Sequence, residues 1–396
     1  MLKRSSFSQF IEEKPLYYKE IDHNRVYRAY RVLKPHIRQP LTTHIVGTNG
    51  KGSTGRIVST LLHHAGKRVG HFSSPHILKF NERIWIEGED ISDEALDVAH
   101  SKLYTILGEE MSSALSYFEY TTLLAFVAME ELDVVVLEAG LGGEFDATNV
   151  CSKTLSIITP IGLDHQDFLG ETIKEIATTK MNSIDNNFVL ALQDEVKVYD
   201  IAKKIEKQKG VEQYDVKQFK ADYLDEYREI KRVTKELGWS EYLFENTLTA
   251  ISALKVLNLS YSIKDLKKVK LFGRFYRLFS NVTIDVGHNL LASKAITKAL
   301  KEQNKSQVIL VYNALNDKDY IKILKEFKPY IKHVEIIEID TPRAVELREL
   351  ESGLKELDIV YTFFNRIDKN EEYLVFGSFY VVETFLNKNR QNINIY

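Results

Sequence analysis

The alternation of short apolar runs with segments of helical periodicity constrains the fold more than any other feature of this 396-residue chain. In the first part of the chain, runs of strand length are each followed by a loop that contains glycine. Segments in which apolar residues return every three or four positions lie between these runs. This order predicts a parallel sheet covered by helices. The expected strands are Thr43–Val46, Asp133–Leu137 and Leu155–Ile158, and the expected helices are Ser53–His64, Phe118–Leu132 and Ile173–Ile184.

The alternation pauses and then resumes in the last third of the chain. Asp194–Trp239 is charged and weakly patterned, and a helical pattern follows at Leu243–Leu257. The segment LFGRFYRLFS after it has the character of a connection between domains. From Val282 onward, the runs VTID, QVILVY, HVEIIEI and YLVFGS alternate with helical segments, which predicts a second, smaller doubly wound domain. We therefore expect one α/β domain over residues 1–272, a linker over 273–279 and a smaller Rossmann-like α/β domain over 280–396.

Composition excludes several classes of function. The formal net charge of -3 argues against a nucleic acid partner, which would need a basic face. Cys151 is the only cysteine, so neither an intrachain disulfide nor a metal site built on thiolates is expected. No apolar run approaches the roughly 18 residues that span a bilayer, and the N-terminus lacks the apolar core of a signal peptide. We expect a cytoplasmic monomer without a membrane partner.

The stretch GTNGKGST, Gly47–Thr54, follows the first expected strand and opens the first expected helix. A glycine loop at this place directs backbone N–H groups at an anion, and the start of the helix adds partial positive charge. Lys51 would neutralise phosphate oxygens, and the hydroxyl of Ser53 or Thr54 would reach Mg²⁺. The strict P-loop pattern is not met, because Ile45 stands where its first glycine belongs and Gly52 separates the lysine from the hydroxyls. From the loop alone, a plain glycine turn stays open as an alternative.

GTNGKGST resembles the shortened P-loop of folylpolyglutamate synthases and the related dihydrofolate synthases, which are ATP-dependent amide-forming ligases of the muramyl-ligase type. Further blocks resemble those of the family in the same order, and the resemblance covers nearly the whole chain except about residues 193–239. It implies a P-loop-type doubly wound sheet in the first domain. The matching blocks are Ser74–Gly88 (SPHILKFNERIWIEG), Phe118–Phe126 (FEYTTLLAF), Leu137–Asn149 (LEAGLGGEFDATN), Ile161–Lys180 (IGLDHQDFLGETIKEIATTK), Phe272–Arg274 (FGR), Asp285–Asn289 (DVGHN), Asp317–Asp319 (DKD), Pro342–Ala344 (PRA) and Gly377–Ser378 (GS).

The resemblance implies a ligase that uses ATP and Mg²⁺ to join L-glutamate to dihydropteroate, to reduced folate (poly)glutamates or to both. ATP would first phosphorylate the acceptor carboxylate, because oxide is a poor leaving group, and the amine would then attack the acyl phosphate. Such phosphoryl transfer depends on positioning and on fixed positive charge. Two alternatives remain: a muramyl-type ligase acting on a cell-wall precursor, and a catalytically inactive nucleotide-binding regulator. Gly52 and the SPHI…FNERI loop favour the folate branch, and joint retention of Glu138, His165 and Lys180 argues against the regulator.

By the same resemblance, ATP and one or two Mg²⁺ ions would bind around the glycine loop, with K⁺ as a further candidate ion. Asn246 would point at the adenosine. Glu138 closes the apolar run DVVVL, where a carboxylate suits Mg²⁺. Lys180 would be carbamylated and hold a second Mg²⁺, or it is a solvated helix lysine; its flanks here are Thr179, Met181 and Asn182. The expected ATP-binding residues of the loop are Thr48, Asn49, Gly50, Lys51, Gly52, Ser53 and Thr54, and the expected metal ligands are Ser53, Ser74, Glu138, His165 and Lys180.

The remaining roles that the resemblance implies concern the substrate and the second domain. Arg83 and Asp146 would bind the pterin-bearing substrate, and Glu144 stands where the family usually has arginine after GLGG. Arg274 and Asp285 would contact ATP, and closure about Leu271–Leu278 would complete the site. The common family wording DGAHNP is here DVGHNL. The expected catalytic residues are Lys51, His165, Lys180, Asp285 and His288.

Overall fold

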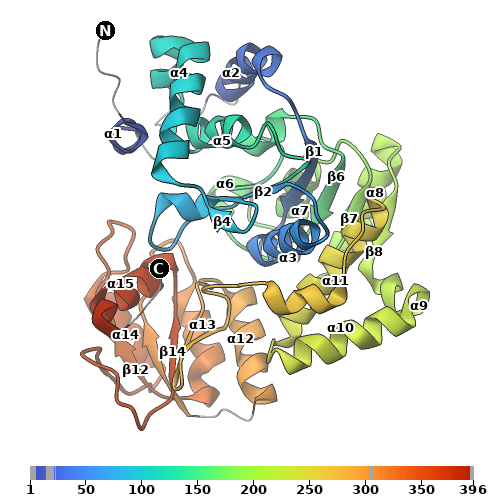
Figure 1. The fold of residues 1–396 in the computed structure, drawn as a ribbon. Helices are drawn as coiled ribbons and strands as arrows, with labels where there is room; N and C mark the ends of the chain where they lie inside the picture. The colour runs from blue at the N-terminus through green and yellow to red at the C-terminus, as the bar shows by residue number, and fades with distance from the viewer. Residues whose placement is uncertain (1–5, 15–21, 23, 304–306, 393–396) are drawn as a thin grey trace. The chain divides into compact units, whose positions relative to one another are not determined.

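The computed structural model describes residues 6–14, 22, 24–303 and 307–392. The chain divides into two compact units (Figure 1). Unit 1 comprises residues 1–161, 171–233 and 245–269, and unit 2 comprises residues 162–170, 234–244 and 270–396. Residues 162–170 and 234–244, which the sequence prediction assigned to the first domain, therefore group with the second unit. The predicted domain boundaries stay a prediction.

Unit 1 contains an eight-stranded sheet in the order β4-β3-β2-β5-β1-β6-β7-β8. The six strands from β2 to β8 in this order are parallel, and β3 and β4 add an antiparallel edge. Because β1 lies between β5 and β6, Ile45 is paired with Glu138, and the ends of these two strands meet at one edge of the sheet. The strands are β1 Leu41–Val46, β2 Val69–Phe72, β3 Ile84–Ile86, β4 Glu89–Asp90, β5 Val134–Glu138, β6 Leu155–Ile158, β7 Phe188–Leu190 and β8 Gln213–Asp215.

Helices cover both faces of this sheet. Val135 and Leu137 of β5 belong to one hydrophobic core with residues of α1, α2, α4 and α5. Because side chains alternate along a strand, Val136 points to the opposite face, where α3 packs against β5 and β2 (Figure 1). Helices α10 and α11 each have residues in both units. The helices are α1 Phe7–Glu12, α2 Arg25–Leu33, α3 Lys51–His64, α4 Asp93–Ala114, α5 Tyr117–Ala128, α7 Ile173–Met181, α8 Val196–Lys209, α9 Phe219–Asp222, α10 Leu224–Glu236 and α11 Glu241–Val256, with short 3₁₀ helices at η1 Lys34–His36, η2 Phe80–Arg83, η3 Ala147–Val150, η4 Val216–Gln218 and η5 Ile263–Lys268.

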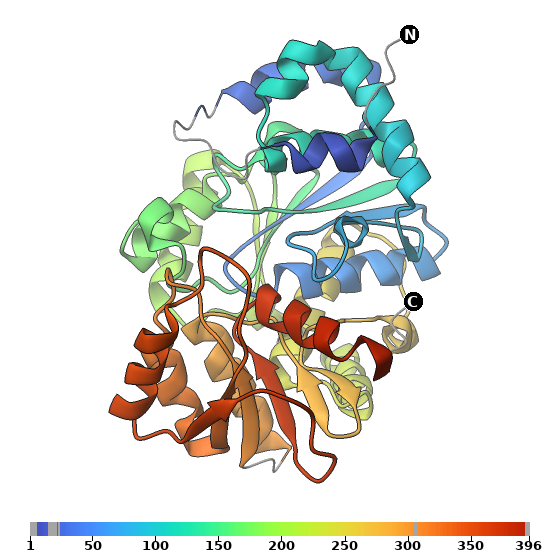
Figure 2. The same cartoon turned by 90° about the vertical axis from the view of Figure 1, so that its left-hand side faces the viewer.

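Unit 2 contains a six-stranded sheet in the order β13-β12-β11-β14-β10-β9, coloured yellow-orange to red in Figure 2. All neighbouring strands are parallel except β9, which pairs antiparallel with β10. One core joins the central strands to α12, α13 and α14. The strands are β9 Tyr276–Phe279, β10 Val282–Ile284, β11 Val308–Tyr312, β12 Ile331–Ile336, β13 Tyr361–Phe363 and β14 Tyr373–Phe376; the helices are α6 Gln166–Leu169, α12 Leu290–Glu302, α13 Tyr320–Phe327, α14 Leu347–Glu356 and α15 Phe379–Lys388, with η6 Lys328–Tyr330 and η7 Arg390–Asn392.

The predicted α/β class with two mostly parallel sheets is confirmed. Within the expected linker 273–279, Tyr276–Phe279 forms β9, which supplies backbone partners to the edge of β10. The weakly patterned region 194–239 forms α8, β8, α9 and α10. Its single strand, β8, is too short to show a periodicity. Among the described residues, no helix combines the length and the apolar character needed to cross a membrane.

Candidate active site

The loop Gly47–Gly50 joins β1 to α3 and is fastened to the end of the neighbouring strand. The backbone N–H groups of Thr48 and Asn49 donate hydrogen bonds to the carbonyl oxygen of Pro160, at 2.9 and 3.2 Å. A Cβ at Gly47 would lie 2.0 Å from the Thr159 hydroxyl oxygen, so only glycine fits there. Pro160 thus accepts the backbone N–H groups of both residues, and the predicted contact of Thr48 and Asn49 with ATP stays a prediction.

The first turn of α3 carries the N–H groups that an anion could reach. Gly50 precedes the helix in a left-handed conformation with φ of 84°, which favours glycine. The N–H groups of Lys51, Gly52 and Ser53 follow, and the first turn of a helix offers them no acceptor within the helix. An anion at this loop would therefore be bound by N–H groups of the first turn of α3 rather than by those of the first loop residues.

Three buried polar atoms at the start of α3 have no hydrogen-bond partner among the described residues. They are the hydroxyl oxygens of Ser53 and Thr54 and the side-chain nitrogen of Asn246. An unsatisfied buried donor or acceptor costs roughly 1–3 kcal/mol, so a group of three calls for a ligand. Asn246 lies against the loop, because a Cβ at Gly50 would be 2.6 Å from its side-chain oxygen. These residues fit a polar, anionic ligand.

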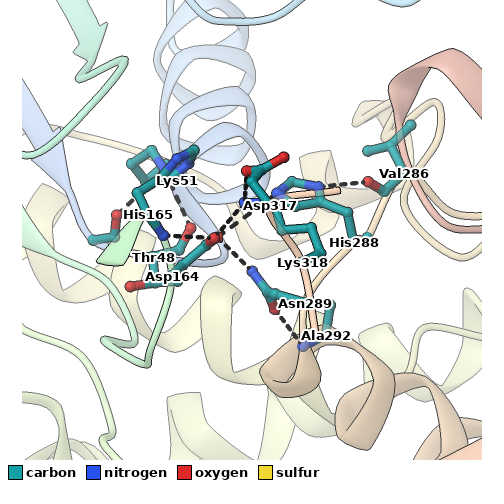
Figure 3. A network of polar contacts seen from close by, with 12 residues as sticks. Thr48, Lys51, Asp164, His165, Val286, His288, Asn289, Ala292, Asp317 and Lys318 are labelled. Carbon is teal, nitrogen blue, oxygen red and sulfur yellow. Dashed lines mark hydrogen bonds and ion pairs between the residues drawn. The ribbon is translucent and has the colours of Figure 1, made fainter. Parts of the chain in front are cut away.

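Lys51, the first residue of α3, lies near Glu138 at the end of β5. The ammonium group of Lys51 donates to the carbonyl oxygens of Thr48 and Gly47 at 3.2 and 3.3 Å (Figure 3). It lies 4.0 Å from a carboxylate oxygen of Glu138, whose other oxygen accepts the N–H of Ser74 at 3.3 Å. Glu138 is only 4% exposed. A buried carboxylate thus lies near the lysine of the glycine loop.

Lys180 lies beneath the same loop. Its ammonium group is buried and donates to the carbonyl oxygen of Gly47 at 2.9 Å. The alternative of a solvated helix lysine is therefore wrong. A Cβ at Gly143 would lie 2.6 Å from the Lys180 carbonyl oxygen, so α7 packs directly against the Gly-Leu-Gly-Gly turn.

Two of the departures from the family wording, Glu144 and Asn182, contact each other. The side-chain amide of Asn182 donates to a carboxylate oxygen of Glu144 at 2.7 Å. The backbone N–H of Glu144 donates to the carbonyl oxygen of Thr179 at 3.1 Å. The unusual residues at positions 144 and 182 therefore form one connection between the turn and the C-terminal end of α7, next to Lys180.

Arg83 is buried among aromatic side chains. Its side-chain Nε donates to Nδ1 of His76 at 2.7 Å, and its guanidinium carbon lies 5.4 Å from the ring centre of Tyr117 and 5.9 Å from that of Phe80. Burial and then the charge of Arg83 lower the pKa of His76 to about 4, so this histidine is neutral at physiological pH. The arrangement gives a cation on an aromatic wall, which is suitable for a flat or carboxylate-bearing molecule.

Asp146 organises the turn that carries it. One carboxylate oxygen accepts the N–H of Leu141 at 2.8 Å, and the other accepts the N–H and the hydroxyl of Thr148 at 2.9 and 2.5 Å. Burial raises the pKa of this carboxyl group against the opposite effect of those hydrogen bonds. Its predicted contact with substrate stays a prediction.

In unit 2, Asp285 holds the segment that carries Arg274. Its carboxylate accepts hydrogen bonds from the N–H of Phe275 at 2.7 Å, from the N–H of Gly287 at 2.7 Å and from the hydroxyl of Tyr242 at 3.1 Å. Phe275 has φ of 46°, an unfavourable value for a residue with a side chain, and the hydrogen bond stabilises it. Arg274 extends next to Phe379, with 5.3 Å between its guanidinium carbon and the ring centre.

His165 and His288 also belong to unit 2, and both adjoin a carboxylate that sequence reasoning missed (Figure 3). Asp164 lies 2.5 Å from the ammonium group of Lys318 and 3.7 Å from Nε2 of His288. Asp164 and Lys318 lie within the matched blocks IGLDH and DKD, but the sequence analysis predicted no role for them. Their place in these blocks was the signal that could have identified them. The contact between the two residues could not be predicted from the blocks.

The predicted metal ligands of unit 1 fit Mg²⁺ better than a softer metal. No cluster of three or more histidine, cysteine or acidic side chains placed to hold a metal occurs within residues 6–14, 22, 24–303 and 307–392. Mg²⁺ keeps several waters and is commonly bound by one or two carboxylates together with substrate phosphates. Glu138 with the unpaired hydroxyl of Ser53 matches that donor set.

Comparison with known proteins gives consistent matches over most of the chain. Residues 45–263 match the model of the Mur ligase middle domain. A dihydrofolate synthase/folylpolyglutamate synthase of Haemophilus influenzae is 32% identical over 87% of this chain and 88% of the relative. The crystal structure of Helicobacter pylori folylpolyglutamate synthetase has 36% identity and a TM-score of 0.74, covering 97% of this chain and 98% of that one. A structure of Escherichia coli FolC in complex with DHPP and ADP has 25% identity and a TM-score of 0.79, covering 98% and 97%.

Proposed function

Because this chain belongs to the dihydrofolate synthase/folylpolyglutamate synthase family of ATP-dependent glutamate ligases in folate metabolism, we propose that it adds L-glutamate to dihydropteroate, to a reduced folate or to both. The resemblance to the folate branch is confirmed. The cell-wall-precursor and inactive-regulator alternatives are set aside, because the relatives are folate-type synthases.

The observation that carries the proposal is the group of buried, unpaired polar atoms at the start of α3. Phosphate oxygens would accept hydrogen bonds from the first-turn N–H groups and from the hydroxyls of Ser53 and Thr54. Lys51, whose ammonium group donates to two loop carbonyls, would turn this group to the outer phosphates. The orphaned amide nitrogen of Asn246 offers a donor to the nucleotide at the other side of Gly50.

The chain's residues would act mainly by orientation and charge. Transfer of the terminal phosphoryl group of ATP to the acceptor carboxylate gives an acyl phosphate and ADP, and the amine of glutamate then displaces phosphate to form the amide. Lys51 would stabilise the charge that builds on the transferring group. A bound Mg²⁺, with Ser53 and Glu138 as its protein ligands, would supply further charge neutralisation. We also propose Ser74, His165 and a carbamylated Lys180 as Mg²⁺ ligands, and K⁺ as a further bound ion.

Four further residues are proposed to contribute to this reaction. Arg274 would contact ATP phosphates, and Asp285 would hold the Arg274 segment through the N–H of Phe275. His288 is proposed to act beside the reacting groups. Arg83 offers a cation to the acceptor, next to the ring faces of Phe80 and Tyr117.

The test is ADP release that depends on both glutamate and acceptor. Purified protein receives ATP, Mg²⁺, L-glutamate and either dihydropteroate or tetrahydrofolate, and product mass identifies the added glutamate. Lys51→Ala should lower turnover by roughly 100-fold or more, as expected for the loss of one charge that stabilises the transition state. Lys67→Ala is the matched control, because Lys67 is an exposed lysine just beyond the end of α3. The proposal would be refuted if folded protein showed no glutamate-dependent ADP release with either acceptor.

A further inference from the structure

The segment 162–170, here called the strap, groups with unit 2 although the residues on both sides of it belong to unit 1. The strap carries His165, which adopts a left-handed conformation with φ of 52°. It packs closely on its own unit, since a Cβ at Gly162 would lie 3.2 Å from the Leu291 side chain at the start of α12. Two features of His165 therefore need a physical explanation: its place in unit 2 and its left-handed backbone conformation.

Asp164 supplies that cause through both oxygens of its carboxylate (Figure 3). Oδ1 accepts the backbone N–H of His165 at 2.9 Å and the ammonium group of Lys318 at 2.5 Å. Oδ2 accepts the side-chain amide of Asn289 at 2.9 Å and lies 3.7 Å from Nε2 of His288. The bond to the His165 N–H stabilises the left-handed turn, and the other contacts attach that turn to unit 2.

The partners of Asp164 are themselves held in place. The side-chain oxygen of Asn289 accepts the N–H of Ala292 at 2.9 Å and so caps α12. The ammonium group of Lys318 also lies 3.1 Å from Asp317, which pairs with Arg343 at 2.8 Å. The carboxylate is therefore fastened to the end of a helix and to a charged turn, two rigid supports.

Burial makes this contact sensitive to the loss of either partner. The side chains of Asp164 and Lys318 are 6% and 4% exposed. Burial acts to raise the pKa of Asp164, but His288, His165 and Lys318 together hold that pKa well below its ordinary range. Removing one member of a buried pair leaves an uncompensated charge, which is strongly destabilising.

We propose that Asp164 is a positioning residue, which sets the backbone of His165 and keeps it attached to unit 2. This inference rests on the proposed function, in which both histidines serve the ligase reaction. Asp164, Lys318 and Asn289 act through those histidines and touch no reacting group themselves.

The test swaps the donor and the acceptor of the hydrogen bond from Asn289 to Asp164. In Asp164→Asn, the new amide faces the amide of Asn289, donor against donor, while its oxygen can still accept the N–H of His165. In Asn289→Asp, two carboxylates face each other, although aspartate still caps α12. In the double variant D164N/N289D, the amide donates to the carboxylate again and the net charge is unchanged. Lys318→Met removes the charged partner, and Lys322→Met is its control, an exposed lysine on α13 that pairs only with Asp319 among the ion pairs described.

Two readouts are needed, and the first does not depend on activity. In hydrogen–deuterium exchange of the ligand-free protein, peptides of the strap should exchange faster in Asp164→Asn, Asn289→Asp and Lys318→Met. Exchange of peptides over α3 should stay unchanged. The double variant should exchange more slowly than Asp164→Asn or Asn289→Asp, and Lys322→Met should exchange like the unchanged protein. In the ligase assay, the single variants should lose about 10- to 100-fold in kcat, the range found when a residue that orients a ligand side chain is replaced. The KM for ATP should stay the same, and the double variant should recover much of kcat.

Unchanged exchange of the strap in Asp164→Asn and Lys318→Met would overturn the proposal. So would a loosened strap with full kcat, or a double variant that is no better than the single ones in either readout. If the unchanged protein shows no glutamate-dependent turnover, the proposed function fails, while the exchange data still decide whether Asp164 holds the strap.

Discussion

Gly50→Ala separates backbone strain from crowding at the start of α3. Gly50 has φ of 84°, and a side chain in this left-handed region costs about 1–2 kcal/mol. The new Cβ would also lie 2.6 Å from the side-chain oxygen of Asn246. Because Asn246 is only 4% exposed, it has little room to move, and such overpacking typically costs about 1–3 kcal/mol. We therefore expect unit 1 to lose about 2–5 kcal/mol of its free energy of unfolding.

The chain offers a matched control at the other end of the same helix. Gly66 also has φ of 84°, but a Cβ there would meet nothing within 4 Å. Gly66→Ala should therefore lose only the strain component, about 1–2 kcal/mol. The difference between the two variants measures the contact with Asn246, and it should shrink when both glycine changes are repeated in an Asn246→Ala background.

Urea unfolding can report unit 1 alone. The chain has two tryptophans, Trp85 in unit 1 and Trp239 in unit 2, so a Trp239→Phe background leaves only Trp85 as the fluorescent probe. The ligase assay should also show a raised KM for ATP in Gly50→Ala and an unchanged one in Gly66→Ala. Equal losses of stability in the two glycine variants would refute the claim that α3 begins in contact with Asn246.

Three further predictions concern other parts of unit 1. Burial lowers the pKa of Lys14 from 10.5 to about 8, so between these values the unfolded chain holds one more proton than the folded one. The free energy of unfolding should then rise with pH across this window relative to Lys14→Met in urea titrations, and parallel curves would contradict the burial. A double-mutant cycle of Glu144→Ala and Asn182→Ala, followed by urea unfolding, should give a coupling of about 0.5–1.5 kcal/mol, whereas additivity would mean that the pair contributes nothing. Lys180→Met should raise the KM for ATP, because the Gly47 carbonyl loses a donor; an unchanged KM would count against this support. Native mass spectrometry at near-neutral pH, where a carbamate keeps its CO₂, tests carbamylation separately, and protein without the added mass of one CO₂ would contradict it.

Local patterns were sufficient for the fold class and for locating the glycine loop and Glu138 at strand ends. The apolar run that ends at Glu138 and the glycine loop before α3 are both short stretches whose backbone is restricted by their own residues. Parallel pairing of β1 with β5 then brings Lys51 and Glu138 together. Periodicity could not reveal short strands such as β8, with three half-buried residues, or the edge strand β9 inside an expected linker.

The sequence by itself determined which residue types were available, where the glycines allow a sharp turn, and that two sheets would form. Only the tertiary structure decided which residues contact each other. It directed the N–H groups of Thr48 and Asn49 to Pro160, and it joined Asp164 to Lys318 across 154 positions of the chain. A side chain's partner is set by which distant segments the packing brings within about 3 Å, and no periodicity along the chain encodes that distance.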